Sequence, residues 1–365
     1  MTSGPNDTDA EPRVAVVGAG AWGTTLALIL ARAEPVILVS HSTESAARLR
    51  ETRRNERRLP GIELPPQIRI TADPEAVRTA SDLVILAVPS AYLRSTTERV
   101  ARFVPAGADV LSVVKGLENE TLLRMTEVIA DASATAGTAI EPSRIAALSG
   151  PNLAAEIARG LPASAVIASS DPALGDRIVA RLSRREFRLY TNPDVLGVEL
   201  CGALKNIVAI AAGAADGLGF GDNGKAGLMT RGLAEMTRLG IAAGANPLTF
   251  AGLAGIGDVI ATCGSKLSRN HRLGEELARG RTWADIEASL PGVAEGAYTV
   301  DAALALAARH GVEMPIAQEV HNALFEGKSV QRCLIDLLSR ESKDELADFE
   351  RWVERLGSPG TERRG

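Results

Sequence analysis

The sequence predicts an α/β fold in which a doubly wound sheet, covered by helices on both faces, precedes an all-α region. In the first half of the chain, short runs rich in Val, Ile and Leu alternate with helical patterns. These runs lack period-two polarity, so they are typical of buried parallel strands. From about residue 193 the runs disappear, and Ala-rich helical patterns punctuated by Gly follow. A regular alternation of strands and helices predicts a doubly wound domain.

The expected strands share this buried, aliphatic composition and lie at residues 13–17, 36–40, 83–88, 110–114, 145–148 and 165–168. Helical patterns such as 24–32 and 121–130 fall between most of them. The second half contains helix candidates at 194–215, 225–244, 270–279, 299–310 and 316–325. We therefore expect a first domain at 12–191 and a helical substrate domain at 192–355, flanked by disordered polar tails at 1–11 and 356–365.

Composition excludes several classes of function. The formal net charge is −5, and the one short basic cluster, at positions 53, 54, 57 and 58, is interpreted as a solvated surface, so no nucleic-acid partner is expected. Residues 1–11 are polar and acidic, unlike a signal peptide, and no run reaches the roughly 20 apolar residues of a membrane span. The three cysteines are widely spaced, which predicts neither a disulfide framework nor a metal site. We expect a cytoplasmic protein.

A glycine-rich loop follows the first expected strand and opens a helix, with Gly18, Gly20 and Gly23 in a GxGxxG pattern. The first glycine permits a tight turn, the second lets the backbone approach a pyrophosphate, and the third lets helix and strand pack closely. Such turns also occur for structural reasons alone. In this context the loop predicts a dinucleotide site, and hence a Rossmann-like N-terminal domain followed by an all-α C-terminal domain.

The end of the second strand bears on the choice of cofactor. Enzymes that use NAD commonly place Asp or Glu there to bind the ribose hydroxyls. Here Val39 is followed by Ser40, His41 and Ser42, with no carboxylate before Glu44. This neutral or basic end favours NADPH, with NAD as a possible second cofactor. The alternative is that His41 is only a surface residue.

Polar groups follow three of the expected strands, where ligands bind in doubly wound folds. Ser90 ends one strand, Lys115 comes directly after the next, and Gly150 and Asn152 come after another. We expect Lys115 to lie in the cleft. The alternative is an edge lysine that extends to solvent.

Lys205 and Asn206 interrupt an otherwise apolar, small-residue helix. A helix that is apolar all round is buried, and a buried ammonium is costly unless it is paired. Lys205 is therefore a candidate proton donor rather than a structural residue. Asp258 and Thr262, four residues apart, share one face of a later helix, and Asp258 is the expected partner of Lys205. A helix cap is the alternative role for Asp258.

The run Ser268-Arg269-Asn270 stands just before a helical pattern. A hydroxyl, a guanidinium and an amide at a helix start form a natural cradle for phosphate. Capping alone explains Ser268 and Asn270, but it does not call for Arg269. The run therefore predicts a phosphorylated small-molecule substrate.

Together these motifs resemble NAD(P)-dependent glycerol-3-phosphate dehydrogenase in its bacterial form. The likeness runs from about residue 13 to 350 in order and spacing. It is carried by the glycine-rich loop and by Lys115-Gly116-Leu117, Gly150-Pro151-Asn152, Gly202-Ala-Leu-Lys205-Asn206, Thr230-Arg231-Gly232-Leu233, Gly252-Leu-Ala-Gly-Ile-Gly-Asp258, Ser268-Arg269-Asn270 and Val293-Ala-Glu295-Gly296.

The resemblance implies roles for individual residues. Lys205 would donate and accept the proton, while Asn206 and Thr262 are expected to orient the reacting groups. Substrate would be bound by Lys115, Gly150, Asn152, Asp258, Ser268, Arg269 and Asn270. The cofactor would contact the glycine loop with Ala21 and Trp22, and also His41, Lys115, Ala154, Arg269, Val293 and Glu295. A homodimer that makes the glycerol backbone of phospholipids is implied as well.

Two positions depart from the commonest family pattern: Ala21 stands where Ser is usual, and Asn152 where Ser or Thr is common. Two other functions are compatible with parts of the sequence. A β-hydroxyacid dehydrogenase relative would also pair a Rossmann domain with a lysine-bearing helical domain, but the cradle at Arg269 argues for phosphate. A non-catalytic NAD(P)-binding sensor would not need Lys205 and Asp258.

Overall fold

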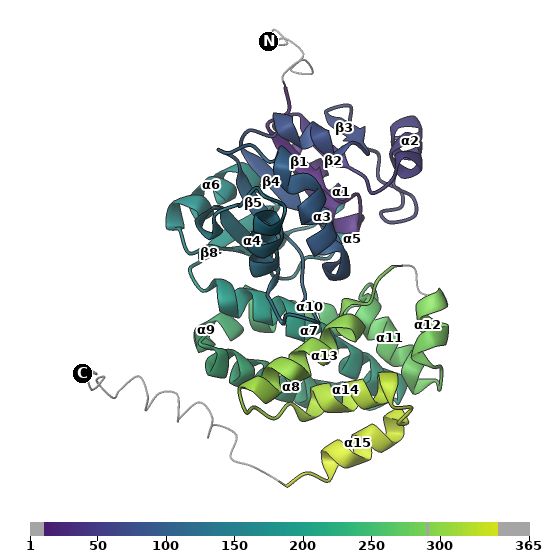
Figure 1. The fold of residues 1–365 in the computed structure, drawn as a ribbon. Helices are drawn as coiled ribbons and strands as arrows, with labels where there is room; N and C mark the ends of the chain where they lie inside the picture. Colours follow the sequence, from purple (N-terminus) through teal and green to yellow (C-terminus); the bar gives the residue numbers. More distant parts are fainter. Residues whose placement is uncertain (1–10, 290–291, 342–365) are drawn as a thin grey trace, which may run out of the picture.

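The computed structural model describes residues 11–289 and 292–341. The expected tails, apart from residue 11, and positions 342–355 of the expected helical domain lie outside the described residues. An N-terminal portion built on a sheet sits above a helical C-terminal portion (Figure 1). This arrangement confirms the predicted fold class.

The N-terminal portion contains one eight-stranded sheet with the order β3-β2-β1-β4-β5-β6-β7-β8. The strands are β1 (Val14–Val17), β2 (Val36–Val39), β3 (Ile68–Thr71), β4 (Leu83–Leu86), β5 (Asp109–Ser112), β6 (Ile145–Ser149), β7 (Ala163–Ala168) and β8 (Phe187–Asn192). The chain leaves β1 towards one edge and returns to β4 on its other side, so the strand order reverses between β1 and β4. Ligands of doubly wound folds bind at such a switch point.

Two strands, β3 and β8, were not predicted from the sequence. Both lie at the edges of the sheet and alternate buried and exposed residues. In β3 the exposed Arg69 separates Ile68 from Ile70, and in β8 Arg188 follows the buried Phe187. An edge strand exposes one face, so a search for continuous apolar runs overlooks it.

One pairing in the sheet is antiparallel, between β6 and β7, where the sequence predicts parallel strands throughout. The connection between them contains only the five-residue helix α5 (Ala154–Ala158). A helix of this length is shorter than a strand and cannot carry the chain back along the sheet, as a parallel crossover requires.

Helices cover both faces of the sheet. They are α1 (Ala21–Leu30), α2 (Thr43–Thr52), α3 (Leu93–Val100), α4 (Met125–Thr135) and α6 (Pro172–Leu182), with short turns η2 (Pro74–Thr79), η3 (Ser90–Tyr92), η4 (Ala101–Phe103) and η5 (Pro142–Arg144). On β1, Val14 and Val16 face a core with α1, whereas Ala15 and Val17 face a core with α3 and α4. The helix expected at 121–130 begins later, at Met125, because Leu122 adopts a left-handed conformation (φ 62°).

The helical portion is built around α7 (Val195–Gly217). Its other elements are α8 (Gly221–Ala243), α9 (Pro247–Phe250), the π-helical turn η6 (Leu253–Gly257), α10 (Asp258–Gly264), α11 (Arg269–Ala278), α12 (Trp283–Ser289), α13 (Glu295–Arg309), α14 (Pro315–Phe325) and α15 (Val330–Leu338). The five expected helices are confirmed as α7, α8, α11, α13 and α14. α8 begins at Gly221, before the expected start at 225; the sequence gives little sign of this first turn, because Gly221 and Gly224 are weak helix formers.

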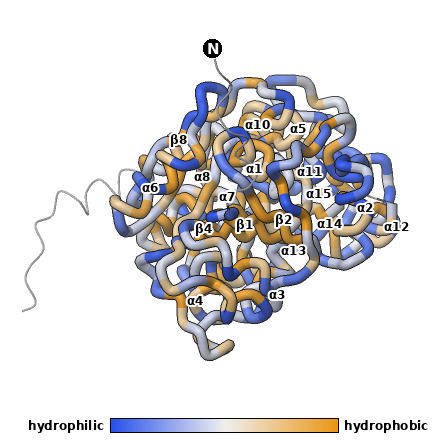
Figure 2. The backbone as a smooth tube through the Cα atoms, turned by 90° about the horizontal axis from the view of Figure 1, so that it is seen from above, coloured by the Kyte–Doolittle hydropathy of each residue, from blue (hydrophilic) through white to orange (hydrophobic). Residues whose placement is uncertain are grey.

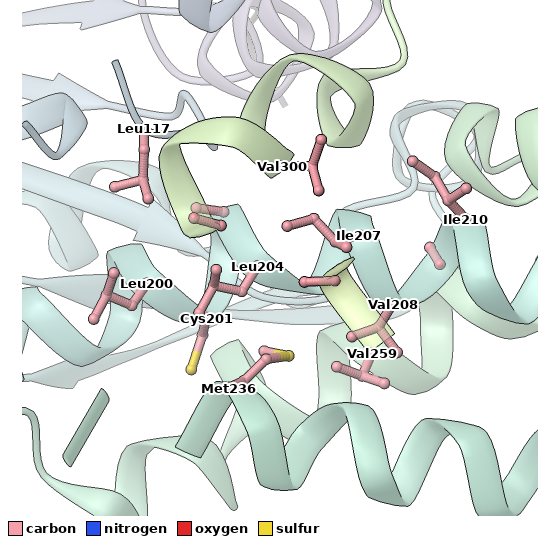
Figure 3. Packing of buried hydrophobic residues seen from close by; sticks show 14 of the residues in the cluster. Leu117, Leu200, Cys201, Leu204, Ile207, Val208, Ile210, Met236, Val259 and Val300 are labelled. Carbon is pink, nitrogen blue, oxygen red and sulfur yellow. The ribbon is translucent and has the colours of Figure 1, made fainter. Parts of the chain in front are cut away.

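Side chains on all sides of α7 are buried. Leu204 and Ile207 of α7 pack in one cluster with Met236 of α8, Val259 of α10 and Val300 of α13 (Figure 3). The same cluster includes Ala147, Val166 and Ala168 of the sheet, so α7 also packs on β6 and β7. This continuous core fixes the position of α7 relative to the sheet.

By length and composition alone, Val195–Gly217 and Pro247–Gly264 are apolar enough to cross a membrane. However, 83% of the apolar window of Val195–Gly217 is buried inside the protein, as expected for a core helix. The second segment is divided among α9, η6 and α10. Apolar segments lie mostly in the interior of the fold, around the strands and α7 (Figure 2).

Candidate active site

The glycine-rich loop joins β1 to α1 at the switch point of the sheet. Gly18 has φ +117°, and a Cβ there would lie 2.4 Å from the carbonyl oxygen of Ala87. A Cβ at Gly23 would lie 2.0 Å from the carbonyl oxygen of Gly18. In contrast, a Cβ at Gly20 would meet nothing within 4 Å. Two glycines are therefore required by the fold itself, and Gly20 leaves open space where a ligand can approach.

The N-terminus of α1 fits a dinucleotide phosphate. Gly20 is the N-cap, and no side chain caps the helix, so its first N–H groups are available to an anion. Trp22, in the first turn, has a buried Nε1 with no hydrogen-bond partner among the described residues. The Ala21 carbonyl accepts a hydrogen bond from Thr25 Oγ1 at 2.9 Å.

Asn55 holds the glycine-rich loop from outside. Its Nδ2 donates to the Ala19 carbonyl at 3.0 Å and to Thr24 Oγ1 at 2.9 Å, and the residue is buried. Sequence analysis missed this residue, because no local pattern distinguishes it from other loop asparagines. It brings the segment after α2 next to the cofactor loop.

The end of β2 carries no carboxylate, as the sequence shows. His41 is exposed directly after the strand, and Ser42 caps α2 by accepting a hydrogen bond from Ser45 N at 3.2 Å. Within the described part of the chain, no hydrogen bond or ion pair holds the side chain of His41. This surface is open to the ribose end of a dinucleotide.

At the centre of the site, Asp258 lies between two lysines. Lys205 Nζ donates to Asp258 Oδ1 at 2.8 Å, and Lys115 Nζ donates to Asp258 Oδ2 at 2.5 Å. Lys205 also donates to Thr262 Oγ1 at 2.5 Å, and Thr262 donates to Asp258 Oδ1 at 3.1 Å. Lys115 further donates to the Gly150 carbonyl at 2.9 Å. The expected pairing of Lys205 with Asp258 is present, and Lys115 belongs to the same cluster.

Burial and charge act together on this cluster. Burial alone would raise the pKa of Asp258, but the two ammonium groups hold that pKa below its usual value. Burial lowers the pKa of Lys115 to about 8; Asp258 opposes this shift and Lys205 adds to it. Two cations around one anion leave a net positive charge, which suits an anionic substrate.

The π-helical turn η6 sets the direction of Asp258. The turn ends at Gly257, and Asp258 begins α10. A Cβ at Gly255 would lie 2.0 Å from the Phe250 carbonyl oxygen, so this turn requires glycine. Single π-turns of this kind often occur at functional sites. The repeated glycines in 252–257 were the sequence signal for it.

The expected phosphate cradle forms the start of α11. Ser268 is the N-cap and accepts a hydrogen bond from His271 N at 3.2 Å. Asn270 Nδ2 donates to Asn206 Oδ1 at 2.9 Å, and Asn270 Oδ1 accepts from Gly296 N at 3.0 Å. Asn270 therefore links α11 to α13 and to α7, the helix that carries Lys205.

Arg269 is exposed and shares its surroundings with Arg58. Its pKa is lowered by desolvation first, with Arg58 adding to the effect and Glu295 opposing it. The residue nevertheless keeps an exposed surface that a ligand can reach. A Cβ at Gly292 would lie 2.7 Å from Arg269 Nη1 and 2.9 Å from Arg58 Nη1. The two guanidinium groups thus approach one backbone position.

The basic cluster at 53–58 is therefore not simply a solvated surface. Arg53 donates to the carbonyls of Leu64 at 3.0 Å and Ile68 at 3.1 Å, and it ends α2 in a left-handed conformation. Arg58 lies at the candidate site. The interpretation from sequence was wrong for Arg53, whose contacts depend on how the following loop folds back, whereas Arg58 is exposed as expected.

The loop after β6 supplies further polar groups. Gly150 has φ +125°, and a Cβ there would lie 3.1 Å from Ala165 Cα. Both amide atoms of Asn152 are buried without a hydrogen-bond partner among the described residues. The Ala154 carbonyl accepts from Thr25 Oγ1 at 3.2 Å, next to the cofactor loop. Unpaired buried amides are costly, so Asn152 fits a residue that binds a ligand.

Glu295 and Val293 lie at the start of α13. Ser90, after β4, donates to Glu295 Oε2 at 2.5 Å, across 205 positions of sequence. Burial raises the pKa of Glu295, against the opposing effects of Ser90 and Arg269. Val293 is half-buried beside this contact. Ser90 was named in the sequence only as part of a strand end, and the structure places it against an expected cofactor residue.

The helix that follows the glycine-rich loop has no side-chain cap and begins at the switch point of the sheet, and the helical portion holds a buried lysine paired with a carboxylate. Together these two features define the protein as a pyridine-nucleotide-dependent oxidoreductase. Comparison with known proteins gives the family. Residues 13–175 match the model of the NAD-dependent glycerol-3-phosphate dehydrogenase N-terminus, and residues 194–335 match that of its C-terminus. The chain belongs to the NAD(P)-dependent glycerol-3-phosphate dehydrogenase family and is an oxidoreductase of this type.

Individual relatives agree with the family match. A glycerol-3-phosphate dehydrogenase [NAD(P)+] from Chlorobium limicola is 44% identical over 91% of this chain and 99% of its own length. One from Frankia casuarinae is 46% identical over 90% and 97%. The crystal structure of glycerol-3-phosphate dehydrogenase from Coxiella burnetii has a TM-score of 0.83 and 36% identity, covering 90% of this chain and 98% of that one.

Among the described residues, no group of three or more His, Cys, Asp or Glu side chains gathers to hold a metal ion. Cys201, Cys263 and Cys333 are buried free thiols.

Proposed function

We propose that the protein reduces dihydroxyacetone phosphate to sn-glycerol 3-phosphate, with Lys205 as the proton donor and, in reverse, the acceptor. The observation that carries this proposal is that Lys205, buried in α7, is hydrogen-bonded to both Asp258 and Thr262. When bound, NAD(P)H supplies the hydride. Lys205 donates its proton to the carbonyl oxygen as negative charge develops there, and Asp258 stabilises the ammonium before that step.

Lys115 and Asn152 are proposed to bind and orient the substrate. Lys115 is fixed by Asp258 and the Gly150 carbonyl, so its charge is held at one side of the reacting group. The unpaired amide of Asn152 suits a hydroxyl or carbonyl of the substrate. Asn206 and Thr262 are proposed to keep the reacting groups aligned, since both contact the catalytic cluster or the cradle.

Arg269 is proposed to hold the substrate phosphate, with Ser268 and Asn270 shaping the helix start around it. Contacts to the remote phosphate would position the carbonyl for reaction. The cofactor is proposed to contact the glycine loop at residues 18, 20 and 23, and also Ala21, Trp22, His41, Lys115, Ala154, Arg269, Val293 and Glu295. We further propose a preference for NADPH, because a 2′-phosphate meets no carboxylate at the end of β2.

We also propose two domains, at 12–191 and 192–355. The two family models support this division, since one ends at residue 175 and the other begins at 194. A cytoplasmic homodimer that supplies sn-glycerol 3-phosphate for glycerophospholipid synthesis is proposed from the resemblance described above.

The proposal is tested by following NADPH oxidation with dihydroxyacetone phosphate and with unphosphorylated dihydroxyacetone. We expect turnover with dihydroxyacetone phosphate. Arg269→Ala should lower kcat/KM for this substrate, by an amount that corresponds to a loss of about 1.5–3 kcal/mol of transition-state stabilisation, as for a charge-assisted contact. Dihydroxyacetone should react poorly with both proteins. An equal loss for the two substrates would remove Arg269 from the phosphate site, and turnover of a β-hydroxyacid instead would overturn the function.

A further inference from the structure

His271 directly follows the phosphate cradle but belongs to a different set of contacts. Its side chain is 4% exposed, and Nε2–H donates to Asp216 Oδ2 at 2.8 Å. Asp216 lies on α7, the helix that carries Lys205. Lys225 of α8 also donates to Asp216 Oδ2, at 3.0 Å. Neither His271 nor Asp216 contributes to the proposed chemistry.

The direction of the hydrogen bond follows from the charge of Asp216. Burial alone would raise the pKa of Asp216, but His271 and Lys225 hold it below its usual value, so the carboxylate is the acceptor. Nε2 of His271 therefore carries the proton. Nδ1 is buried and has no hydrogen-bond partner among the described residues. Asp216 is thus the polar anchor of the ring.

The two helices joined by this pair touch through their backbones. A Cβ at Gly213 of α7 would lie 1.8 Å from the His271 carbonyl oxygen. A Cβ at Gly274 of α11 would lie 1.9 Å from the Ile210 carbonyl oxygen. Contact between smooth glycine surfaces sets the separation of the helices, but it resists sliding along their axes only weakly. Directional hydrogen bonds resist such sliding, and His271 with Asp216 adds one to the bond that Asn270 makes to Asn206.

The hydrogen bond between His271 and Asp216 acts on the first turn of α11, which also carries Arg269. Arg269, Asn270 and His271 are consecutive residues in the first turn of α11, and the turn is otherwise held by the Ser268 cap and by the contacts of Asn270. Arg58 lies near Arg269, and the repulsion between two guanidinium groups favours displacement of this turn.

We propose that His271 is a positioning residue for phosphate recognition: its hydrogen bond to Asp216 sets the register of α11 on α7, and so the place of Arg269 relative to Lys205. This inference rests on the proposed role of Arg269 as the phosphate contact. It assigns His271 to the binding of phosphorylated substrate through Arg269 and not to proton transfer.

The test is a double-mutant cycle with His271→Leu, Arg269→Ala and the combined variant. Leu fills much of the ring volume but cannot bind Asp216. We expect His271→Leu to raise KM for dihydroxyacetone phosphate by roughly tenfold, because small misplacements of a binding group weaken positioning strongly. The NADPH dissociation constant, measured by fluorescence, should change less than KM, since Arg269 is the one proposed cofactor contact on α11 and the glycine loop belongs to the sheet portion. In the Arg269→Ala background, His271→Leu should have little further effect on KM.

Two control variants separate positioning from general stability. His271→Gln places an amide N–H near Nε2 and should restore most of the KM. Lys225→Met removes the other partner of Asp216, at a site with a side chain 24% exposed, and should leave KM unchanged. If His271→Leu folds poorly, Asp216→Ala breaks the same hydrogen bond from α7 and should reproduce the rise in KM.

The outcomes are distinguishable. If His271→Leu lowers the melting temperature but leaves KM unchanged, the positioning role is wrong. The same conclusion follows if the increases in KM from His271→Leu and Arg269→Ala multiply in the combined variant. In both cases the role of Arg269 in phosphate binding is unaffected. An Arg269→Ala variant with normal KM overturns the cradle itself, and the inference with it.

Discussion

Lys205 and Asp258 are joined by a hydrogen bond of 2.8 Å, although 53 residues separate them in sequence. The second oxygen of the same carboxylate binds Lys115, which comes from the sheet portion of the chain. One buried aspartate therefore connects the candidate proton donor with the lysine proposed to bind the substrate. The cluster closes only when the sheet and the helical portion pack together, so its chemistry depends on the whole fold.

Replacing Lys205 with Met should remove the proton donor while keeping its apolar stem. The surrounding helix is already apolar, so the fold should survive. Turnover of dihydroxyacetone phosphate should fall by roughly two to four orders of magnitude, the usual range for a lost general acid. Both kcat and the affinity for NADPH should be measured, and NADPH affinity should persist.

Lys205→Arg is the matched control for charge. Arginine keeps the positive charge beside Asp258 but holds its proton too tightly to donate it, so little activity should return. Near-normal turnover in a folded Lys205→Met variant would rule out Lys205 as the donor, and Lys115 would become the next candidate.

The Lys115 ammonium should give the enzyme a descending limb above pH 8. Its pKa is lowered to about 8, so the group is charged below that pH and neutral above it. If the charged form binds the phosphorylated substrate, kcat/KM should fall up to about tenfold per pH unit once pH exceeds this value. The limb is measured by NADPH oxidation at low substrate concentration.

Lys115→Arg tests the assignment, because Lys115 shares the carboxylate of Asp258 with a second lysine. Arginine stays protonated throughout, so the limb should move to higher pH or disappear. A limb unchanged in the variant would mean that another group of the cluster is responsible.

How far the sequence predicts this molecule depends on the range of the contacts involved. The glycine-rich loop is predicted well, because its three glycines are needed for the backbone conformation and close packing of one turn and one helix. Lys205 is noticeable because an ammonium stands out in an apolar helix. Arg58 and Asn55 are not predictable in this way, since each acquires its role only when the loop after α2 folds back onto the site.

The missed strands have a related explanation. A strand buried on both faces is a continuous run of apolar residues, whereas a strand buried on one face alternates apolar and polar residues. β3 and β8 are buried on one face only, so a search for continuous apolar runs does not find them. The antiparallel β7 depends on the length of the connection that precedes it, which the strand's own residues do not encode.

Gly20 and Gly18 should respond differently to alanine. A Cβ at Gly20 meets nothing within 4 Å, so Gly20→Ala should fold with nearly unchanged stability and lose affinity for NADPH as the methyl group enters the ligand's space. Gly18→Ala should destabilise the protein itself, because φ is +117° and the new atom would lie 2.4 Å from the Ala87 carbonyl oxygen. Melting temperature and NADPH binding are the two measurements. Normal NADPH affinity in Gly20→Ala would contradict a pyrophosphate site at this loop.

Replacing His41 with Asp should shift the cofactor preference towards NADH. His41 is exposed directly after β2, where a carboxylate would repel a 2′-phosphate and bind ribose hydroxyls instead. The ratio of kcat/KM for NADPH to that for NADH is the measurement, and it should fall by at least about tenfold, the effect of roughly 1.4 kcal/mol of lost charge complementarity. His41→Asn is the matched control, because it has the shape of Asp without its charge, and it should change the ratio much less. Equal ratios in the wild type and both variants would show that His41 does not face the 2′ position. Ser40 would then be the next side chain to replace, because its buried hydroxyl has no partner among the described residues.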